Sequence, residues 1–207
     1  MPVERFYHTP DSVWGFWKVA EDEALLNDIV AVETVPADIV NPLKRLEFLA
    51  GRALIQSLLQ RWDLPYHGLM KDAFGKPFLS NSRIQISLSH SYPYVAAVVH
   101  RHKNVGIDLE QPKEKLLKVA PRILAGEELK DAGDNVVKHC VYWCAKETLI
   151  KIHGKKYLIL SKNLLVTPFS LREKGHLIGR IIANDTETAI PLEYYVYDNF
   201  VVAVSGS

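Results

Sequence analysis

Apolar residues recur along the chain with two spacings, one typical of strands and one typical of helices. Residues 13–19 (VWGFWKV) combine aromatic and β-branched side chains, which favours a strand, and residues 21–30 continue with helical spacing. A longer apolar stripe begins after Asn41 and continues to about Trp62. Asn41 is a suitable N-cap and Pro42 suits the first helical position, so the sequence predicts a long helix here.

The same order of elements then appears a second time. Short strands are expected at residues 83–88, 94–99 and 105–110. Helices are predicted at residues 116–125 and from about 135 to 153, followed by strands near 164–171, 177–182, 192–197 and 200–204.

The two cycles also resemble each other residue by residue. FLAGRALI around Ala50 matches WCAKETLI around Ala145, and YVAAVV at 94–99 matches FVVAV at 200–204. Duplication explains this order, although short matches also arise by chance between amphipathic helices and between apolar strands. We predict an α+β fold of two similar halves, residues 1–103 and 104–207, each a small antiparallel sheet packed with a long helix.

Charge and composition narrow the class of partner. Twenty-five Lys and Arg balance 24 Asp and Glu, which favours neither a nucleic acid nor an anionic membrane as partner. Residues 1–10 lack the apolar stretch of a signal peptide, and no apolar run approaches the roughly 20 residues of a membrane-spanning helix. We therefore expect a cytoplasmic protein without a membrane segment.

Cysteine chemistry contributes little to the interpretation. Cys140 and Cys144 stand four apart in a helical pattern, and His139 is the nearest further candidate ligand. Structural zinc needs four ligands, so we interpret the two cysteines as packing residues.

The segment VGIDLE at 105–110 carries the first candidate chemistry. Strand alternation places Asp108 and Glu110 on one face, with Gly106 beside them. Two such carboxylates suit a hard cation such as Mg²⁺. An edge strand with a solvated acidic face is the simpler interpretation for a DxE sequence taken alone.

The segment WCAKETLIK at 143–151 carries the second set of candidate functional residues. Trp143, Glu147 and Lys151 share one helical face, away from the apolar positions. Taken alone, Glu147 and Lys151 at i and i+4 are better explained as an ordinary helix ion pair.

Three further segments offer donors to an anion. SLSHS at 87–91 places Ser89 and His90 at a strand end, and FGKPF at 74–78 places Lys76 in a turn between Gly75 and Pro77. Arg45 and Arg52 are seven apart on one helix and can clamp phosphates, although solvated helix arginines are common.

Taken in this order, the segments at 74–78, 87–91, 105–110 and 143–151 resemble the signature of phosphopantetheinyl transferases of the larger, pseudodimeric type. The resemblance extends from about Arg45 to Lys151. It implies an enzyme that moves 4'-phosphopantetheine from coenzyme A to a serine of an apo acyl or peptidyl carrier protein, with release of 3',5'-ADP, and a coenzyme site between the two halves.

The resemblance also implies roles for individual residues. Mg²⁺ would be held by Asp108, Glu110 and Glu147 together with the pyrophosphate of coenzyme A. The groups expected to bind coenzyme A are Arg45, Arg52, Lys76, Ser89, His90 and Lys151. Lys151 would stabilise charge on the phosphate during transfer, and Glu147 would be the general base, directly or through a metal-bound water.

Two other functions fit parts of this pattern. A non-catalytic module would bind coenzyme A or a carrier protein without transfer, and the complete acidic triad argues against it. A nucleotide hydrolase would use the same metal with water as nucleophile. The carrier could belong to fatty acid, polyketide or nonribosomal peptide biosynthesis, and the stretch between Asp108 and Trp143, which often docks the carrier in this family, is shorter than usual. Two halves in one chain make a monomer sufficient.

Overall fold

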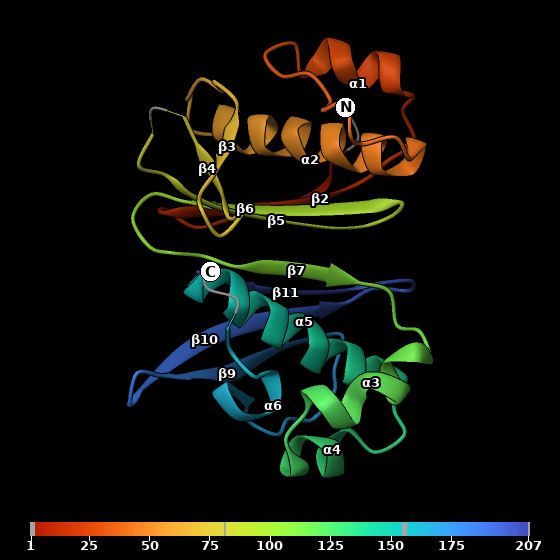
Figure 1. Ribbon diagram of the computed structural model, residues 1–207, viewed down its shortest axis with the longest axis vertical. Coiled ribbons are helices and arrows are strands. Elements are labelled where there is room, and N and C mark those ends of the chain that lie inside the picture. The colour runs from red at the N-terminus through yellow and green to blue at the C-terminus, as the bar shows by residue number, and fades with distance from the viewer. Residues whose placement is uncertain (1–2, 81, 155–156, 207) are drawn as a thin grey trace. The chain divides into compact units, whose positions relative to one another are not determined.

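The computed structural model describes residues 3–80, 82–154 and 157–206 of the chain. The fold divides into two compact units, unit 1 (Met1–Asn104) and unit 2 (Val105–Ser207). In each unit a long helix packs on an antiparallel sheet (Figure 1). The prediction of an α+β fold is therefore confirmed.

Unit 1 is built on a four-stranded antiparallel sheet of order β1-β2-β6-β5. Its elements in chain order are β1 (Val3–His8), β2 (Ser12–Lys18), α1 (Glu23–Ile29), α2 (Pro42–Gln60), β3 (Leu69–Lys71), β4 (Pro77–Leu79), β5 (Gln85–Ser91) and β6 (Tyr94–His100). Helix α2 packs on β6, β2 and β5, whereas β3 and β4 form a separate hairpin.

The start of α2 shows why this segment is helical. The side chain of Asn41 accepts hydrogen bonds from the backbone N–H groups of Leu43 and Lys44, and Pro42 follows directly. Leu49, Ala50, Ala53, Leu54 and Leu58 of the stripe are buried, and Leu46 is partly buried at the edge of the same core. The predicted helix, its cap and its buried face are all confirmed.

Unit 2 is built on a five-stranded antiparallel sheet of order β7-β11-β10-β9-β8. Its elements are β7 (Ile107–Glu110), α3 (Lys115–Ile123), α4 (Gly126–Ala132), α5 (Val136–His153), α6 (Leu160–Asn163), β8 (Leu164–Val166), β9 (Lys174–Ala183), β10 (Thr186–Val196) and β11 (Val201–Ser205). Helix α5 begins at the Asn135 cap and ends at Gly154, whose φ of 77° is left-handed.

Helix α5 lies unusually close to the backbone that leads into β7. A Cβ atom on Gly106 would stand 2.3 Å from the carbonyl oxygen of Thr148, so only glycine permits this approach. The hydroxyl of Thr148 donates to the carbonyl of Ala203 at 3.0 Å on β11. These two contacts hold α5 at Thr148 close to the backbone before β7 and to β11.

The two units share one order of elements. In each, the strand that precedes the helices leads through them to the long helix, and the last strand of the unit pairs antiparallel with that strand, β6 with β2 and β11 with β7. The matched strand sequences place Ala97 of β6 at the position of Ala203 in β11. Gly15 faces Ala97 and Asp108 faces Ala203, so Gly15 is the counterpart of Asp108.

Some elements were not predicted from the sequence. Strand β1 carries charged residues and has no apolar alternation, the hairpin strands β3 and β4 have three residues each, and the seven-residue α4 has a weak apolar pattern. The strand expected at 164–171 is shorter, because β8 ends at Val166 and Pro168 cannot donate to a ladder. Among the helices of the described chain, none combines the length and apolar character needed to cross a bilayer.

Candidate functional site

Asp108 and Lys151 form the centre of the candidate site in unit 2. The buried carboxylate of Asp108 accepts a hydrogen bond from the Lys151 ammonium at 2.8 Å. The same ammonium donates to the carbonyl of Ile107 at 2.8 Å. Lys151 therefore links α5 to β7, the two elements that carry the segments 143–151 and 105–110 identified in the sequence.

Glu147 lies on the same face of α5, one turn before Lys151. Burial raises the pKa of Glu147, the nearby Asp108 carboxylate raises it further, and Lys151 lowers it. Among the described residues, none makes a hydrogen bond or an ion pair shorter than 4.0 Å with the Glu147 carboxylate. The carboxylates of Asp108 and Glu147 thus repel each other in a partly buried environment, and a bound cation would reduce this repulsion.

Glu110, the third predicted metal ligand, is engaged locally. One of its carboxylate oxygens accepts from the backbone N–H of Gln111 at 2.8 Å, and the other lies 4.0 Å from the ammonium of Lys115. Across residues 3–80, 82–154 and 157–206, no cluster of three or more His, Cys, Asp or Glu side chains is arranged to hold a metal ion. The structure brings together Asp108, Glu147 and Lys151, and the full ligand triad stays a prediction.

The donor chemistry nevertheless fits Mg²⁺ better than a softer metal. Asp108, Glu110 and Glu147 supply only oxygen atoms, as hard cations require. Both cysteines are buried and free, and their thiols are directed at the carbonyls of Glu110 and Val201. Burial raises the pKa of Cys144, which disfavours the thiolate that zinc would need.

Lys76 occupies the turn of the β3–β4 hairpin, as predicted. The Asp72 side chain accepts from the backbone N–H groups of Phe74 at 2.8 Å and Lys76 at 2.9 Å, and Gly75 has a φ of 84°. Burial lowers the pKa of the Lys76 ammonium and Asp72 raises it. Within the described part of the chain, no carboxylate lies within 4.0 Å of this ammonium, so it is a placed cation without an ion-pair partner.

Ser89 and His90 lie near the end of β5. Ser89 is buried, whereas the His90 side chain is 44% exposed. The Nδ1 atom of His90 lies 3.1 Å from a carboxylate oxygen of Glu47. Sequence reasoning did not identify Glu47, although a charged residue at a buried position of the α2 stripe was a detectable signal.

The two arginines predicted to clamp phosphates are already paired with carboxylates. Arg45 makes a two-pronged contact with Glu23, at 2.5 and 2.8 Å, and Arg52 lies 2.7 Å from Glu33. Tyr66 also donates to Glu33. A phosphate would have to compete with these pairs, which tie α2 to α1 and to the loop after it, so the role of the two arginines stays a prediction.

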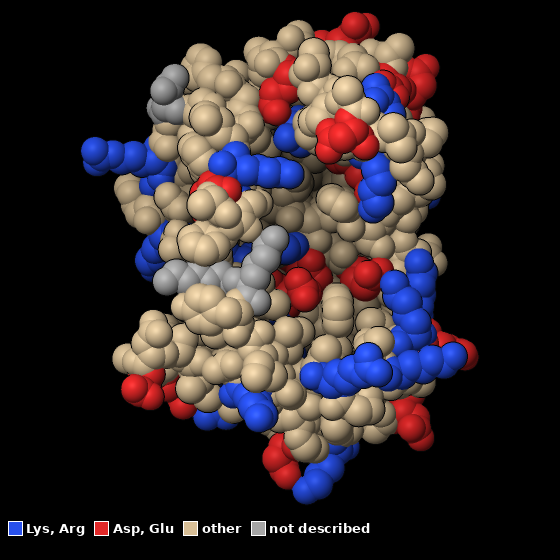
Figure 2. Space-filling view, viewed as in Figure 1, with Lys and Arg blue, Asp and Glu red and all other residues tan. Residues whose placement is uncertain are grey.

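The matched helices show where the two units differ chemically. FLAGRALI and WCAKETLI align Arg52 with Glu147, and the strand registers align Gly15 with Asp108. Only unit 2 therefore carries the acidic pair at these positions. Figure 2 shows one face of the molecule with Asp and Glu in red and Lys and Arg in blue, and basic side chains gather over α3 of unit 2.

Comparison with known proteins gives the same family as the motifs. The family model of the 4'-phosphopantetheinyl transferase superfamily matches residues 104–205, which include the whole β7–α5 site. The 4'-phosphopantetheinyl transferase HetI of Nostoc sp. is 29% identical over 161 residues, which cover 67% of each chain. On these findings, the chain is similar to the 4'-phosphopantetheinyl transferase superfamily over residues 104–205, nearly the whole of unit 2.

Proposed function

We propose that this protein is a Mg²⁺-dependent 4'-phosphopantetheinyl transferase of the pseudodimeric type. It transfers the phosphopantetheine arm of coenzyme A to a serine of an apo carrier protein and releases 3',5'-ADP. The observation that carries the proposal is the contact of Lys151 with Asp108 beside the unpaired Glu147, within the unit that matches the family.

The reaction is an attack of the serine hydroxyl oxygen on the β-phosphorus of coenzyme A. The bond from that phosphorus to the oxygen of the 3',5'-ADP group breaks, and the hydroxyl proton must leave the serine. Glu147 accepts this proton, directly or through a water, because it is the carboxylate that α5 carries one turn before Lys151, near Asp108. Lys151 stabilises the negative charge that grows on the phosphate oxygens.

Asp108, Glu110 and Glu147 would hold the Mg²⁺ ion. When bound, the ion supplies charge neutralisation and orientation at the pyrophosphate oxygens. In this proposal, Asp108 would bind the ion beside its contact with Lys151, and Glu110 would supply a further carboxylate oxygen.

The coenzyme itself is bound by groups that donate to phosphate. Lys76 and His90 are the strongest candidates, because each offers a cationic or protonatable nitrogen from a fixed backbone position. Ser89, Arg45, Arg52 and Lys151 complete the proposed set of coenzyme ligands.

The exposed face of α3 is proposed to receive the carrier protein. Lys115, Lys118 and Arg122 are exposed and share one helical face, in the region where Figure 2 shows basic side chains together. This face favours an acidic partner and steers its approach. The assay below decides whether the carrier serves fatty acid, polyketide or nonribosomal peptide synthesis. The cytoplasmic location and the monomeric state of the protein stay predictions.

The decisive experiment measures the intact mass of apo carrier proteins after incubation with this protein, coenzyme A and Mg²⁺. A gain of one phosphopantetheine group that disappears with EDTA supports the proposal. Release of 3',5'-ADP without any carrier would indicate a hydrolase instead. Coenzyme A binding by calorimetry with no release and no mass gain on any carrier would indicate a non-catalytic module.

A further inference from the structure

A buried carboxylate at Glu47 stands directly behind His90. The Glu47 side chain is only 3% exposed. It contacts three donors: His90 Nδ1 at 3.1 Å, the backbone N–H of Tyr92 at 3.0 Å and the Lys44 ammonium at 2.6 Å. Burying a carboxylate among the apolar positions of α2 is costly unless it is well paired, so this arrangement requires an explanation.

The carboxylate is ionised despite its burial. Burial alone would raise the pKa of Glu47, but hydrogen bonds from His90 and Lys44 outweigh it and bring the pKa to about 2. An ionised carboxylate only accepts hydrogen bonds. The His90 nitrogen that faces it must therefore carry a hydrogen.

We propose that Glu47 is a positioning residue that holds the Nδ1–H of His90 against its carboxylate, with Nε2 turned outward, where it donates to a phosphate of coenzyme A once the ring carries a second proton. The proposal rests on the proposed function, in which His90 is a coenzyme ligand. Glu47 is new to the proposed coenzyme site: it sets the orientation and tautomer of the His90 ring without itself contacting the coenzyme.

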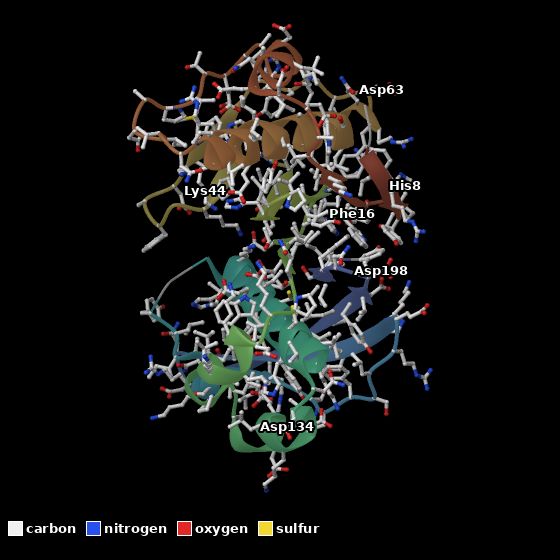
Figure 3. The ribbon with its side chains drawn as sticks, turned by 90° about the vertical axis from the view of Figure 1, so that its right-hand side faces the viewer. His8, Phe16, Lys44, Asp63, Asp134 and Asp198 are labelled. Carbon is white, nitrogen blue, oxygen red and sulfur yellow. The ribbon has the colours of Figure 1, made fainter. Side chains whose placement is uncertain are left out.

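Glu47 is the group placed to orient the His90 ring. Among the described residues, the charged group that contacts the ring is Glu47 of α2, which Lys44 also contacts, whereas the neighbours of His90 on β5 are Ser89 and Ser91 and its partner in the ladder is Val95. Lys44, labelled in Figure 3, comes from the first turns of α2 and is largely exposed. Glu47 therefore provides the negative charge that stabilises an imidazolium when an anion binds at Nε2.

The contact with Tyr92 adds a second restraint. Its N–H donates to the other oxygen of Glu47, and the residue lies in the turn between β5 and β6. One carboxylate thus fixes both the ring of His90 and the turn that follows it. The resulting site is preorganised, so that binding a phosphate requires little further ordering.

The test combines ¹⁵N NMR of the His90 ring with calorimetric titration of coenzyme A. In the wild-type protein the ring nitrogen shifts should report a protonated Nδ1. Glu47→Gln keeps an oxygen for the Tyr92 amide but removes the charge. It should weaken coenzyme A binding about ten- to hundredfold, the loss expected for one charge-assisted hydrogen bond.

A double-mutant cycle separates positioning from a general effect on folding. In a His90→Ala background, Glu47→Gln should weaken coenzyme A binding less than threefold further, since the ring is already gone. Glu128→Gln is the matched control, because Glu128 is equally buried at 2% exposed and ion-paired to Lys146 in unit 2. It should lower the melting temperature without changing coenzyme affinity or the His90 shifts.

Equal losses from Glu47→Gln with and without His90 would overturn the proposal, and so would a wild-type ring protonated only at Nε2. The NMR result does not depend on transfer activity. A wild-type protein that fails to bind coenzyme A would therefore refute the proposed function, while the shifts would still decide whether Glu47 sets the tautomer.

Discussion

The ammonium of Lys151 lies 2.8 Å from the carboxylate of Asp108 on β7, although Glu147 stands one helical turn before it on α5. A pair between Glu147 and Lys151 would have been an ordinary helix contact, which contributes about 0.3 to 0.5 kcal/mol. The cross-element contact instead leaves Glu147 without a close cationic partner in the described structure. A protein that held these residues only for helix stability would not need this arrangement.

Replacing Glu147 by Gln should lower turnover about 100-fold or more, the size expected for loss of a general base, while coenzyme A still binds. The variant also removes a partly buried negative charge beside Asp108, so the metal-free protein should melt at the same or a higher temperature. Turnover is followed by 3',5'-ADP release and stability by thermal unfolding. The exposed Glu127→Gln is the control, and near-normal turnover in Glu147→Gln would remove Glu147 from the mechanism.

Replacing Asp108 by Ala should abolish the Mg²⁺-dependent activity. The change removes a proposed ligand and leaves the Lys151 ammonium with only the Ile107 carbonyl among its two observed acceptors. Initial rates are measured across a Mg²⁺ titration for both proteins. A variant that keeps activity with the wild-type Mg²⁺ dependence would show that the ion is held elsewhere.

Replacing Gly106 by Ala should destabilise unit 2 by about 1 to 3 kcal/mol, as expected for overpacking, because the new Cβ would stand 2.3 Å from the backbone oxygen of Thr148. Helix α5 must then move away from β7, so transfer activity should also fall. Gly126→Ala is the matched control, since a Cβ there meets nothing within 4 Å. Urea unfolding measures both variants, and equal stabilities would contradict the close approach.

Replacing Lys118 by Glu should raise the KM for the carrier protein about tenfold at low salt, with little change in the KM for coenzyme A, because the exposed face of α3 is proposed to attract an acidic partner. The difference should shrink as salt is added, since exposed charges are screened. Lys18→Glu, also exposed but on β2, is the control for overall charge. Equal effects of the two variants would place the carrier contact elsewhere.

Local signals in the sequence account for most of the fold. The Asn41 and Asn135 caps, the apolar stripes of α2 and α5 and the alternation at 105–110 each depend on neighbouring residues, and each predicted its element. Strand β1 escaped prediction because a charged edge strand has no apolar alternation.

The contacts between residues of the site that are far apart in the sequence could not be predicted. Spacing placed Glu147 and Lys151 on one face of a helix, but nothing local indicates that Lys151 reaches Asp108, which lies 43 positions earlier. The pairs of Arg45 with Glu23 and of Glu47 with His90 are of the same kind. Such contacts depend on how helices pack on sheets, and periodicity alone does not determine this.

His100 gives the protein a predictable response to acid. Its buried ring, 4% exposed, accepts hydrogen bonds at Nδ1 from the backbone N–H groups of His102 and Lys103, both at 3.0 Å, which requires an unprotonated Nδ1. Burial lowers the pKa of His100, and the charges of Lys103 and His102 lower it further against the opposing effect of Asp11.

The unfolded chain, with a histidine pKa of about 6.5, therefore takes up a proton at a higher pH than the folded chain does. The free energy of unfolding falls as the pH drops below about 6.5. Chemical unfolding at pH 7.5 and 5.5 should show a larger loss for the wild type than for His100→Asn, which keeps an acceptor that does not titrate, and equal losses would show that His100 is not the group responsible.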